Sequence, residues 1–419
     1  MSSSAVGMVP IVGGQANGGD AGGCEIQLPR AFDGLKPPGD RAKPISAEEF
    51  EARMRRAQER MGKAKPAMEA MVLGPGSSLY YFSGIRWGLS ERLLAMAIPR
   101  QGEPVLVVPA FEESRVRESL RYPTEILSWQ EDQSPTKLLA KALAEKKVSM
   151  GRVGIDEALP YTFYQHLREA GPGYEFVPAD EVTIACRAVK SEHELELMRL
   201  GCAATCDVFR AVLASLEEGM TREKISELVD GGFGKMKLRG GALVLVGEAA
   251  ALPHGSKQPQ IVKPGSVVLI DGGCVVEGYE SDVTRTGVLG TPSEKQQRAF
   301  ELVRSAQDAA LEAARAGRLS GSVDDAARAV IAKGGYGPDY KYFTHRLGHG
   351  IGLDGHEHPY LVRGSTTVLQ PGMTFSNEPG IYVPGEFGIR CEDDMAIRAE
   401  GPASLLTPGF QVSLEKPLG

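Results

Sequence analysis

Short apolar runs and longer amphipathic stretches alternate through the first part of the chain. Between residues 46 and 187, compact apolar runs predict strands, and apolar residues at helical spacing predict helices. The predicted strands are 71–73, 79–82, 93–98, 105–108 and 153–155. The predicted helices are 112–120, 134–145 and 161–170, preceded by one that begins at a capping box, 46–49. This alternation predicts a small α/β domain that ends near Arg187.

The remainder of the chain shows one order of elements twice. Helices are predicted at 191–219, 221–236, 291–317 and onward from Ser322, and strands at 242–246, 266–271, 281–289, 373–379 and 387–398. Capping boxes open the first and third of these helices. The repeated order of helix, helix and strands predicts a single α+β domain made of two similar halves.

Residues 1–45 have a different character. They are rich in Gly, Ser, Pro and Ala and show little hydrophobic periodicity, which predicts a flexible or loosely attached arm. The predicted organisation is therefore an arm at 1–45, an N-terminal α/β domain at 46–187 and an α+β domain at 188–419.

Composition and charge argue against several classes of function. The 419 residues carry a net charge of −7, which offers no basic surface for nucleic acid. No apolar run reaches membrane-spanning length, and the first residues lack the charged start and apolar core of a signal peptide. The six cysteines are scattered, and most stand in apolar contexts. That pattern is typical of reduced thiols in a cytoplasmic protein.

Histidines gather in one stretch of the chain. Four of the seven, His345, His349, His356 and His358, fall within residues 342–358. Imidazole is both a common metal ligand and a proton carrier near neutral pH. The glycines around His349 argue against a helix there, so His345 and His349 are not expected to share a helix face, and only His349 is expected to bind metal. This stretch is the predicted active site.

Two acidic residues follow the histidines at matched distances from a predicted turn. If a hairpin is centred on Gly385, Glu378 and Glu392 lie directly opposite each other. Facing like charges on one sheet repel each other and destabilise the pair. A cation between the two carboxylates is the simplest way to remove that repulsion.

A second acidic pair flanks a predicted turn at Glu277 and Gly278. Asp271 and Asp282 are expected to lie within about a residue of facing each other across this hairpin. Asp271 ends an apolar run, and burying an unpaired charge there would be costly. Two carboxylate pairs with one histidine suit two bridged divalent ions, of Mn, Co, Fe or Zn.

A structural interpretation of the same acids is open. They could be turn and edge-strand residues that form ion pairs with Arg285, Arg346 and Arg390. For any one acid this reading is as good as a metal site, but it is weaker for the four acids together.

Six short motifs carry a family resemblance. They are His254 in Leu-Pro-His-Gly, Asp271 in Leu-Ile-Asp-Gly-Gly, Asp282 in Ser-Asp-Val-Thr-Arg-Thr, His349 in Gly-His-Gly-Ile-Gly-Leu, Glu378 in Asn-Glu-Pro-Gly-Ile-Tyr and Glu392 in Gly-Ile-Arg-Cys-Glu-Asp. In this order they resemble the pita-bread metallopeptidases, the family that includes prolidase, aminopeptidase P, methionine aminopeptidase and creatinase. The resemblance covers residues 191–419, and the preceding α/β domain is similar to the creatinase-type N-terminal domain.

The resemblance implies a fold and an activity. The expected fold is α+β, with a pita-bread catalytic domain of two pseudo-symmetric halves behind the smaller α/β domain, in a homodimer. The expected cofactors are two divalent ions, Mn first and Co, Zn or Fe next. A metal-bridging hydroxide would hydrolyse the Xaa-Pro bond of a small peptide that carries proline after the scissile bond.

It also implies roles for individual residues. The metal ligands would be Asp271, Asp282, His349, Glu378 and Glu392, with Asp282 and Glu392 bridging. Glu378 would also handle the proton of the attacking water. His254 and His356 would contact the substrate and stabilise the tetrahedral intermediate.

Within the family the chain is most similar to bacterial Xaa-Pro dipeptidases. Some prolidases carry an arginine that binds the dipeptide's carboxylate at the position where this chain has Tyr360, and the nearest arginine along this segment is Arg363. His345 is expected beside the ligands. Arg390 would hold a ligand carboxylate or form a structural ion pair, and Tyr382 would reach the pocket or pack in the core. The alternatives to a prolidase are an aminopeptidase P acting on longer Xaa-Pro peptides and a non-catalytic binding protein on the same fold.

Overall fold

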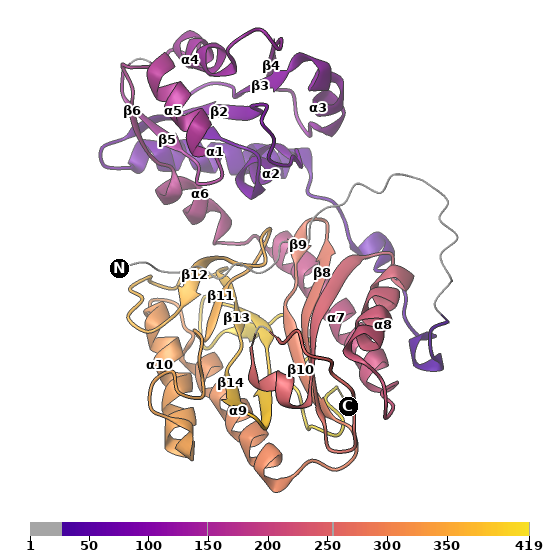
Figure 1. Cartoon of the computed structure of the whole chain (residues 1–419). Coiled ribbons are helices and arrows are strands. Elements are labelled where there is room, and N and C mark those ends of the chain that lie inside the picture. Colours follow the sequence, from indigo (N-terminus) through magenta and orange to yellow (C-terminus); the bar gives the residue numbers. More distant parts are fainter. Residues whose placement is uncertain (1–26, 149, 254, 419) are drawn as a thin grey trace.

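The computed structural model describes residues 27–148, 150–253 and 255–418. An N-terminal α/β domain, indigo to magenta in Figure 1, lies beside a larger α+β domain, magenta to yellow. The largest cluster of buried apolar side chains runs from the first domain into the long helices of the second. A separate cluster fills the second half of the larger domain. Among the described residues, no helix combines the length and apolar character needed to cross a membrane.

The N-terminal domain is built on one mixed sheet of six strands in the order β4-β3-β2-β1-β5-β6. Its strands are β1 (Met68–Leu73), β2 (Ala95–Pro99), β3 (Val105–Pro109), β4 (Glu125–Trp129), β5 (Arg152–Ile155) and β6 (Glu175–Pro178). Its helices are α1 (Ala47–Lys63), α2 (Ser77–Ser83), α3 (Glu113–Ser119), α4 (Pro135–Glu145), α5 (Tyr161–Ala170) and α6 (Asp180–Arg187). The predicted alternation of strands and helices is confirmed, and α1 begins with the predicted capping box of Ser46 and Glu49.

One predicted strand of this domain is wrong. Residues 79–82 lie in helix α2, where Leu79, Tyr81 and Phe82 are all buried. A short apolar run that is buried on every side has no periodicity to separate a strand from a helix. The left-handed conformation of Gly84, with φ 78°, ends this helix after two turns.

The larger domain repeats one order of elements, as predicted. Its first half contains α7 (Glu192–Leu213), α8 (Arg222–Lys235), β7 (Arg239–Val246), β8 (Val267–Val276), β9 (Tyr279–Glu280) and β10 (Val283–Val288). Its second half contains α9 (Glu294–Ala313), α10 (Ser320–Ile331), β11 (Gly348–Gly350), β12 (Glu357–Leu361), β13 (Thr374–Asn377), β14 (Gly380–Val383), β15 (Phe387–Arg390), β16 (Asp393–Ala396) and β17 (Ser404–Leu405). The fold class is therefore confirmed as α+β behind a smaller α/β domain.

Three sheets meet in this domain. Strands β10, β8 and β7 form one sheet, to which β9 adds at β8, and the second runs in the order β12-β11-β13-β16-β17. The β14–β15 hairpin forms a third. An isolated bridge between Thr284 and Glu392 joins the first half to the second. This bridge brings the acidic residues of both halves to one place.

The hairpin around Gly385 has the predicted register. Val383 pairs with Phe387 and Gly380 with Arg390, and the same register continues in β13 and β16, where Asn377 pairs with Asp393. Glu378 and Glu392 fall between these two paired segments. Glu378 and Glu392 therefore occupy matching positions on the two antiparallel segments, where the ladder of paired strands is interrupted.

The register of the other hairpin differs from the prediction, because Asp282 lies two residues from the partner of Asp271. Thr284, rather than Asp282, pairs with Asp271 across β10 and β8. The two-residue turn at Glu277 and Gly278, with φ values of 49° and 96°, determines this register. The strand places Asp282 two residues before Thr284, so Asp271 and Asp282 are diagonal neighbours rather than facing ones.

The segment before the N-terminal domain is packed along residues 27–45. Phe32 is fully buried, and Leu35 and Ile45 join the same apolar cluster as α7 and α8. In Figure 1 the indigo segment beside α8 is this stretch. A loosely attached arm is therefore wrong for residues 27–45, because their scattered apolar side chains are enough to anchor them. Residues 1–26 of the predicted arm lie outside the described part of the chain.

Candidate metal centre

Five side chains with metal-ligand chemistry converge where the two halves of the larger domain meet. They are Asp271, Asp282, His349, Glu378 and Glu392, which the sequence predicts as ligands. Donor atoms lie within 4.8 Å of one another in two groups, Asp271–Asp282–Glu392 and His349–Glu378–Glu392. Glu392 belongs to both groups, so the two could form adjoining cation sites with a shared carboxylate.

Strand β11 positions His349 through a close approach of three backbones. A Cβ at Gly348 would lie 2.0 Å from the Ser376 carbonyl oxygen, and one at Gly350 would lie 2.4 Å from the His358 carbonyl. Glycine is the only residue that permits this spacing. The Ser376 hydroxyl accepts a hydrogen bond from the His349 backbone N–H at 3.1 Å. Strands β12 and β13 thus enclose His349, which is 2% exposed.

Thr284 is the main proton donor shared by the buried acids. Its hydroxyl oxygen lies 2.6 Å from an Asp271 oxygen and 2.5 Å from a Glu392 oxygen. A hydroxyl has one proton, so it can donate to only one of these carboxylates at a time. Asp282 Oδ1 is buried with no hydrogen-bond partner among the described residues. The acids therefore outnumber their donors, which is the condition a cation would relieve.

The electrostatics of the acids divide them into two classes. Burial opposes ionisation of Asp271, but the Arg390 guanidinium overcomes it and lowers the pKa of that carboxyl. Burial, and then the charges of Asp271 and neighbouring acids, raise the pKa of Asp282 well above its ordinary value. Burial likewise raises the pKa of Glu392 well above normal and that of Glu378 to about 8. Three of the four acids thus lack the positive charge that their burial requires.

His349 presents the form of imidazole that binds metals. Burial, followed by the neighbouring His356, lowers its pKa well below the ordinary value, which keeps the ring neutral. Its Nδ1 lies 3.1 Å from the Gly350 carbonyl oxygen, which can accept only from a protonated nitrogen. Nε2 is then the free acceptor, and it lies 3.4 Å from Glu378 and 3.8 Å from Asp282. A backbone acceptor of this kind is the usual way to orient a ligating histidine.

Arg390, Tyr382 and His345 form a chain of hydrogen bonds behind the acids. Arg390 donates to Asp271 at 2.6 Å and to the Tyr382 hydroxyl at 2.8 Å. That hydroxyl lies 2.7 Å from His345 Nε2, and His345 Nδ1 is 3.7 Å from Glu378. The hydroxyl of Tyr382 therefore connects two groups of the centre, although its ring is buried among core residues.

The structural interpretation of the acids holds for only one of the four. Arg390 pairs with Asp271, but Arg285 pairs with Asp393 in a site where both side chains are fully buried. Among the described residues, Arg346 forms no ion pair with any acid. Arg285 also donates to the Glu392 carbonyl oxygen at 2.6 Å, a supporting contact that the sequence did not indicate.

His356 lies at the exposed side of the centre. Its ring stacks on that of His349 at a centroid distance of 3.6 Å, and the two rings with Asp282 form a third group of potential ligands. His254 lies outside the described residues. Tyr360 pairs with His349 across β11 and β12, whereas Arg363 pairs with Asp339 at 2.7 Å and is 44% exposed. The ion pair with Asp339 shows that Arg363 is engaged in a surface contact.

The loop that carries His356 is held by residues that the sequence did not single out. Arg187 at the end of α6 donates to Glu357 at 2.6 Å and also to Asp354. Lys190, three residues later, donates to Glu357 as well. His356 therefore stands between two acids that are anchored to the connection between the domains. No short motif marks these partners, because they lie 167 and 170 residues apart along the chain.

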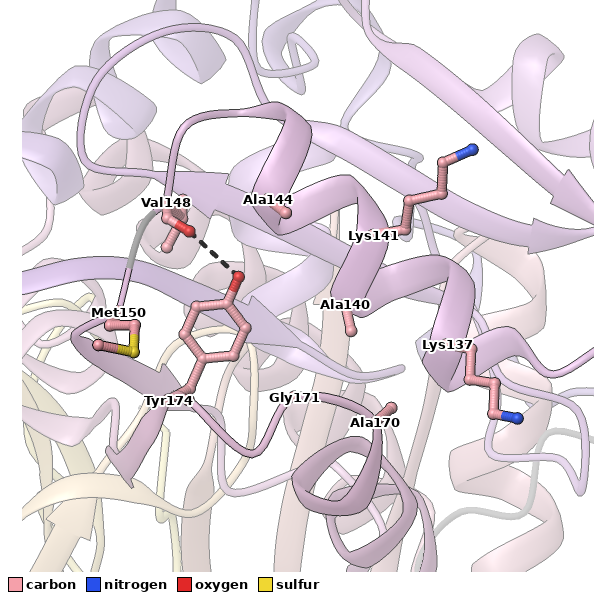
Figure 2. A pocket seen from close by; sticks show the side chains of 10 residues that line it. Lys137, Ala140, Lys141, Ala144, Val148, Met150, Ala170, Gly171 and Tyr174 are labelled. Atoms are coloured by element: carbon pink, nitrogen blue, oxygen red, sulfur yellow. Dashed lines mark hydrogen bonds between the residues drawn. The ribbon is translucent and has the colours of Figure 1, made fainter.

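One surface depression lies away from the metal centre. A depression of about 530 Å³ lies between α4 and the segment after α5 in the N-terminal domain, beside Lys137, Lys141 and Met150 (Figure 2). The Tyr174 hydroxyl there donates to the Val148 carbonyl oxygen at 3.1 Å. Its lining includes neither histidine nor carboxylate, so it offers no alternative site for the same chemistry.

Comparisons with known proteins agree with this arrangement. Residues 196–399 match metallopeptidase family M24, and residues 53–189 match the creatinase/prolidase N-terminal domain. The chain is 33% identical over 321 residues to an Xaa-Pro dipeptidase of Pyrococcus horikoshii, covering 75% of this chain and 86% of the relative.

Solved structures show the same likeness. A dipeptidase PepE from Mycobacterium ulcerans superposes with a TM-score of 0.81 at 30% identity, over 90% of this chain and 100% of that one. A prolidase from Thermococcus sibiricus superposes with a TM-score of 0.77 at 30% identity, over 86% of this chain and 97% of that one.

Proposed function

The chain belongs to metallopeptidase family M24, and from this we propose that it hydrolyses the Xaa-Pro bond of dipeptides. The observation that carries the proposal is the pair of adjoining ligand groups that share Glu392. The relatives named Xaa-Pro dipeptidase and prolidase support the substrate class.

We propose that Asp271, Asp282, His349, Glu378 and Glu392 hold two divalent cations. The unpartnered Asp282 oxygen and the excess of carboxylates over proton donors support this assignment. Oxygen ligands with one imidazole suit Mn first, and Co, Fe or Zn next. Two such cations would lower the pKa of a water molecule and polarise the scissile carbonyl.

The protein's own residues would then orient the substrate and carry the proton. Glu378 lies between His349 and His345, where it can hold the proton released on attack and pass it to the leaving amine. His356, exposed and stacked on His349, faces the side from which substrate enters. Arg390 keeps Asp271 ionised and aligned.

The domain division, assembly and location are further parts of the proposal. The matched ranges 53–189 and 196–399 support a division into domains at 46–187 and 188–419. Free, buried cysteines in the described residues support a reducing, cytoplasmic location. A homodimer is the assembly we propose, on the family resemblance of the sequence.

The test is hydrolysis of Ala-Pro by metal-stripped protein after addition of Mn, Co or Zn. We expect metal-dependent cleavage that Asp282→Asn lowers by more than about 100-fold, since even indirect partners of a metal site cost 10- to 100-fold. Asp308→Asn, which removes an exposed acid paired with Arg304, is the matched control and should keep full activity.

Other outcomes separate the alternatives. Cleavage of Ala-Pro-Ala with no cleavage of Ala-Pro would identify an aminopeptidase P. Metal binding without hydrolysis of either peptide would identify a non-catalytic binding protein.

A further inference from the structure

Arg346 places a positive charge at the exposed side of the metal centre. Its guanidinium lies over the Tyr360 ring, 4.3 Å from the centroid, and its Nη2 lies 3.2 Å from His356 Nδ1. His356 in turn stacks on His349. One imidazole therefore separates the guanidinium from the predicted ligands.

This guanidinium differs from the other arginines around the centre. Arg390, Arg285 and Arg187 each form an ion pair with a buried acid. Among the described residues, Arg346 has no carboxylate partner, and its single hydrogen bond leaves most of its five donors available.

Tyr360 gives this arginine a fixed orientation. It pairs with His349 across the ladder, so both side chains lie on the same face of the sheet. A guanidinium stacked on an aromatic ring keeps its edge donors available for a planar anion. The tyrosine thus serves as a platform for an arginine that comes from the loop before β11.

We propose that Arg346 binds the C-terminal carboxylate of the dipeptide substrate and so selects dipeptides over longer peptides. The inference rests on the proposed function. A residue spans about 3.5 Å, so a dipeptide's carboxylate lies one residue beyond the scissile bond. A longer peptide presents a neutral amide at that point, and a charge-assisted bond is about twice as strong as a neutral one.

The test compares Ala-Pro with Ala-Pro amide, which lacks only the negative charge. Hydrogen bonds to charged groups contribute about 1.5–3 kcal/mol, so wild type should prefer the acid by roughly 10- to 100-fold in kcat/KM. Arg346→Gln should remove that preference by slowing cleavage of Ala-Pro while leaving Ala-Pro amide nearly unchanged. Arg298→Gln, an exposed arginine on α9, should keep the wild-type ratio.

Each other outcome has one meaning. If Arg346→Gln slows both substrates equally, the arginine positions His356 and the proposal is wrong. If Arg363→Gln removes the preference instead, the carboxylate is bound by the other arginine. If wild type cleaves both substrates equally, carboxylate selection is absent although the proposed function stands. If wild type cleaves neither with any added metal, the proposed function itself fails.

Discussion

Tyr382 combines two roles in one side chain. Its ring is 2% exposed and packs in the core, while its hydroxyl joins Arg390 to His345. Since His345 Nδ1 lies 2.8 Å from the Arg346 carbonyl oxygen, it is the protonated nitrogen. Nε2 then accepts from Tyr382, whose oxygen accepts from Arg390. The Tyr382 hydroxyl thereby accepts one hydrogen bond from Arg390 and donates one to His345.

Tyr382→Phe separates the ring from the hydroxyl. We expect kcat/KM to fall by 10- to 100-fold, because Arg390 and His345 lose the group that aligns them. The free energy of unfolding, measured in urea, should fall by only about 1–3 kcal/mol, the cost of leaving a buried Arg390 N–H without its acceptor.

Tyr174→Phe is the control for this prediction. It removes a tyrosine hydroxyl bonded to a backbone carbonyl in the N-terminal domain. Wild-type kcat/KM is expected for it. Full activity of Tyr382→Phe would show that only the ring matters.

The residue types of the candidate site are readable from the sequence, but its contacts are not. Acids at the ends of apolar runs and a cluster of histidines point to Asp271 and His349 because both features are local. Arg346 pairs with Tyr360 and Arg187 with Glu357 through the tertiary fold alone. Their partners lie 14 and 170 residues away, so no spacing rule links them.

Strand β11 shows how an element as short as three residues can determine the site. It carries His349 between β12 and β13, and its flanking glycines have backbone atoms where a Cβ would be. Substitutions at Gly348 and Gly350 are therefore limited by the backbones of the neighbouring segments rather than by side-chain volume.

Gly348→Ala should separate β11 from β13. The new Cβ would lie 2.0 Å from the Ser376 carbonyl oxygen, which cannot move without breaking the ladder. We expect the free energy of unfolding to fall by about 3 kcal/mol and metal affinity to weaken, measured by denaturation and calorimetric titration. Gly234→Ala in α8 meets no atom within 4 Å and should be neutral or slightly stabilising. Equal effects from the two substitutions would contradict this account.

Turn chemistry explains which elements the sequence could predict. Gly385 and the pair Glu277–Gly278 specify their hairpins, so the registers follow from local residues. The sequence did not predict that Asp271 faces Thr284 rather than Asp282, because a shift of the turn centre by one residue moves the paired residue by two. The helix at 79–82 was missed because burial on all sides removes the pattern that distinguishes helix from strand.

At the scale of the whole molecule, the centre joins the two halves of the larger domain. Thr284 from the first half and Glu392 from the second meet in a single bridge, and the acids around it repel one another. A cation bound there would bind the folded chain far better than the unfolded one. Metal should therefore act on global stability as well as on activity.

Removal of metal by a chelator should lower the melting temperature. Addition of Mn at 100 times its dissociation constant should stabilise the fold by about 2.7 kcal/mol, measured by thermal unfolding. Asp282→Asn should show a smaller gain, because it removes a ligand from the centre. A melting temperature that does not respond to divalent ions would argue against a built metal site.

The N-terminal domain is attached to the larger domain at both of its ends. The chain enters it through residues 27–45, where Phe32 lies against Gly232 of α8 and the Lys43 carbonyl oxygen is 3.1 Å from His193. It leaves through Arg187 and Lys190, which hold Glu357 beside His356. Between these two ends the domains share the largest apolar cluster, and Arg53 of α1 donates to the buried Tyr279 hydroxyl at 2.7 Å. Because the Glu357 anchor belongs to this packed interface, a substitution that loosens the interface should also displace the His356 loop at the mouth of the metal centre.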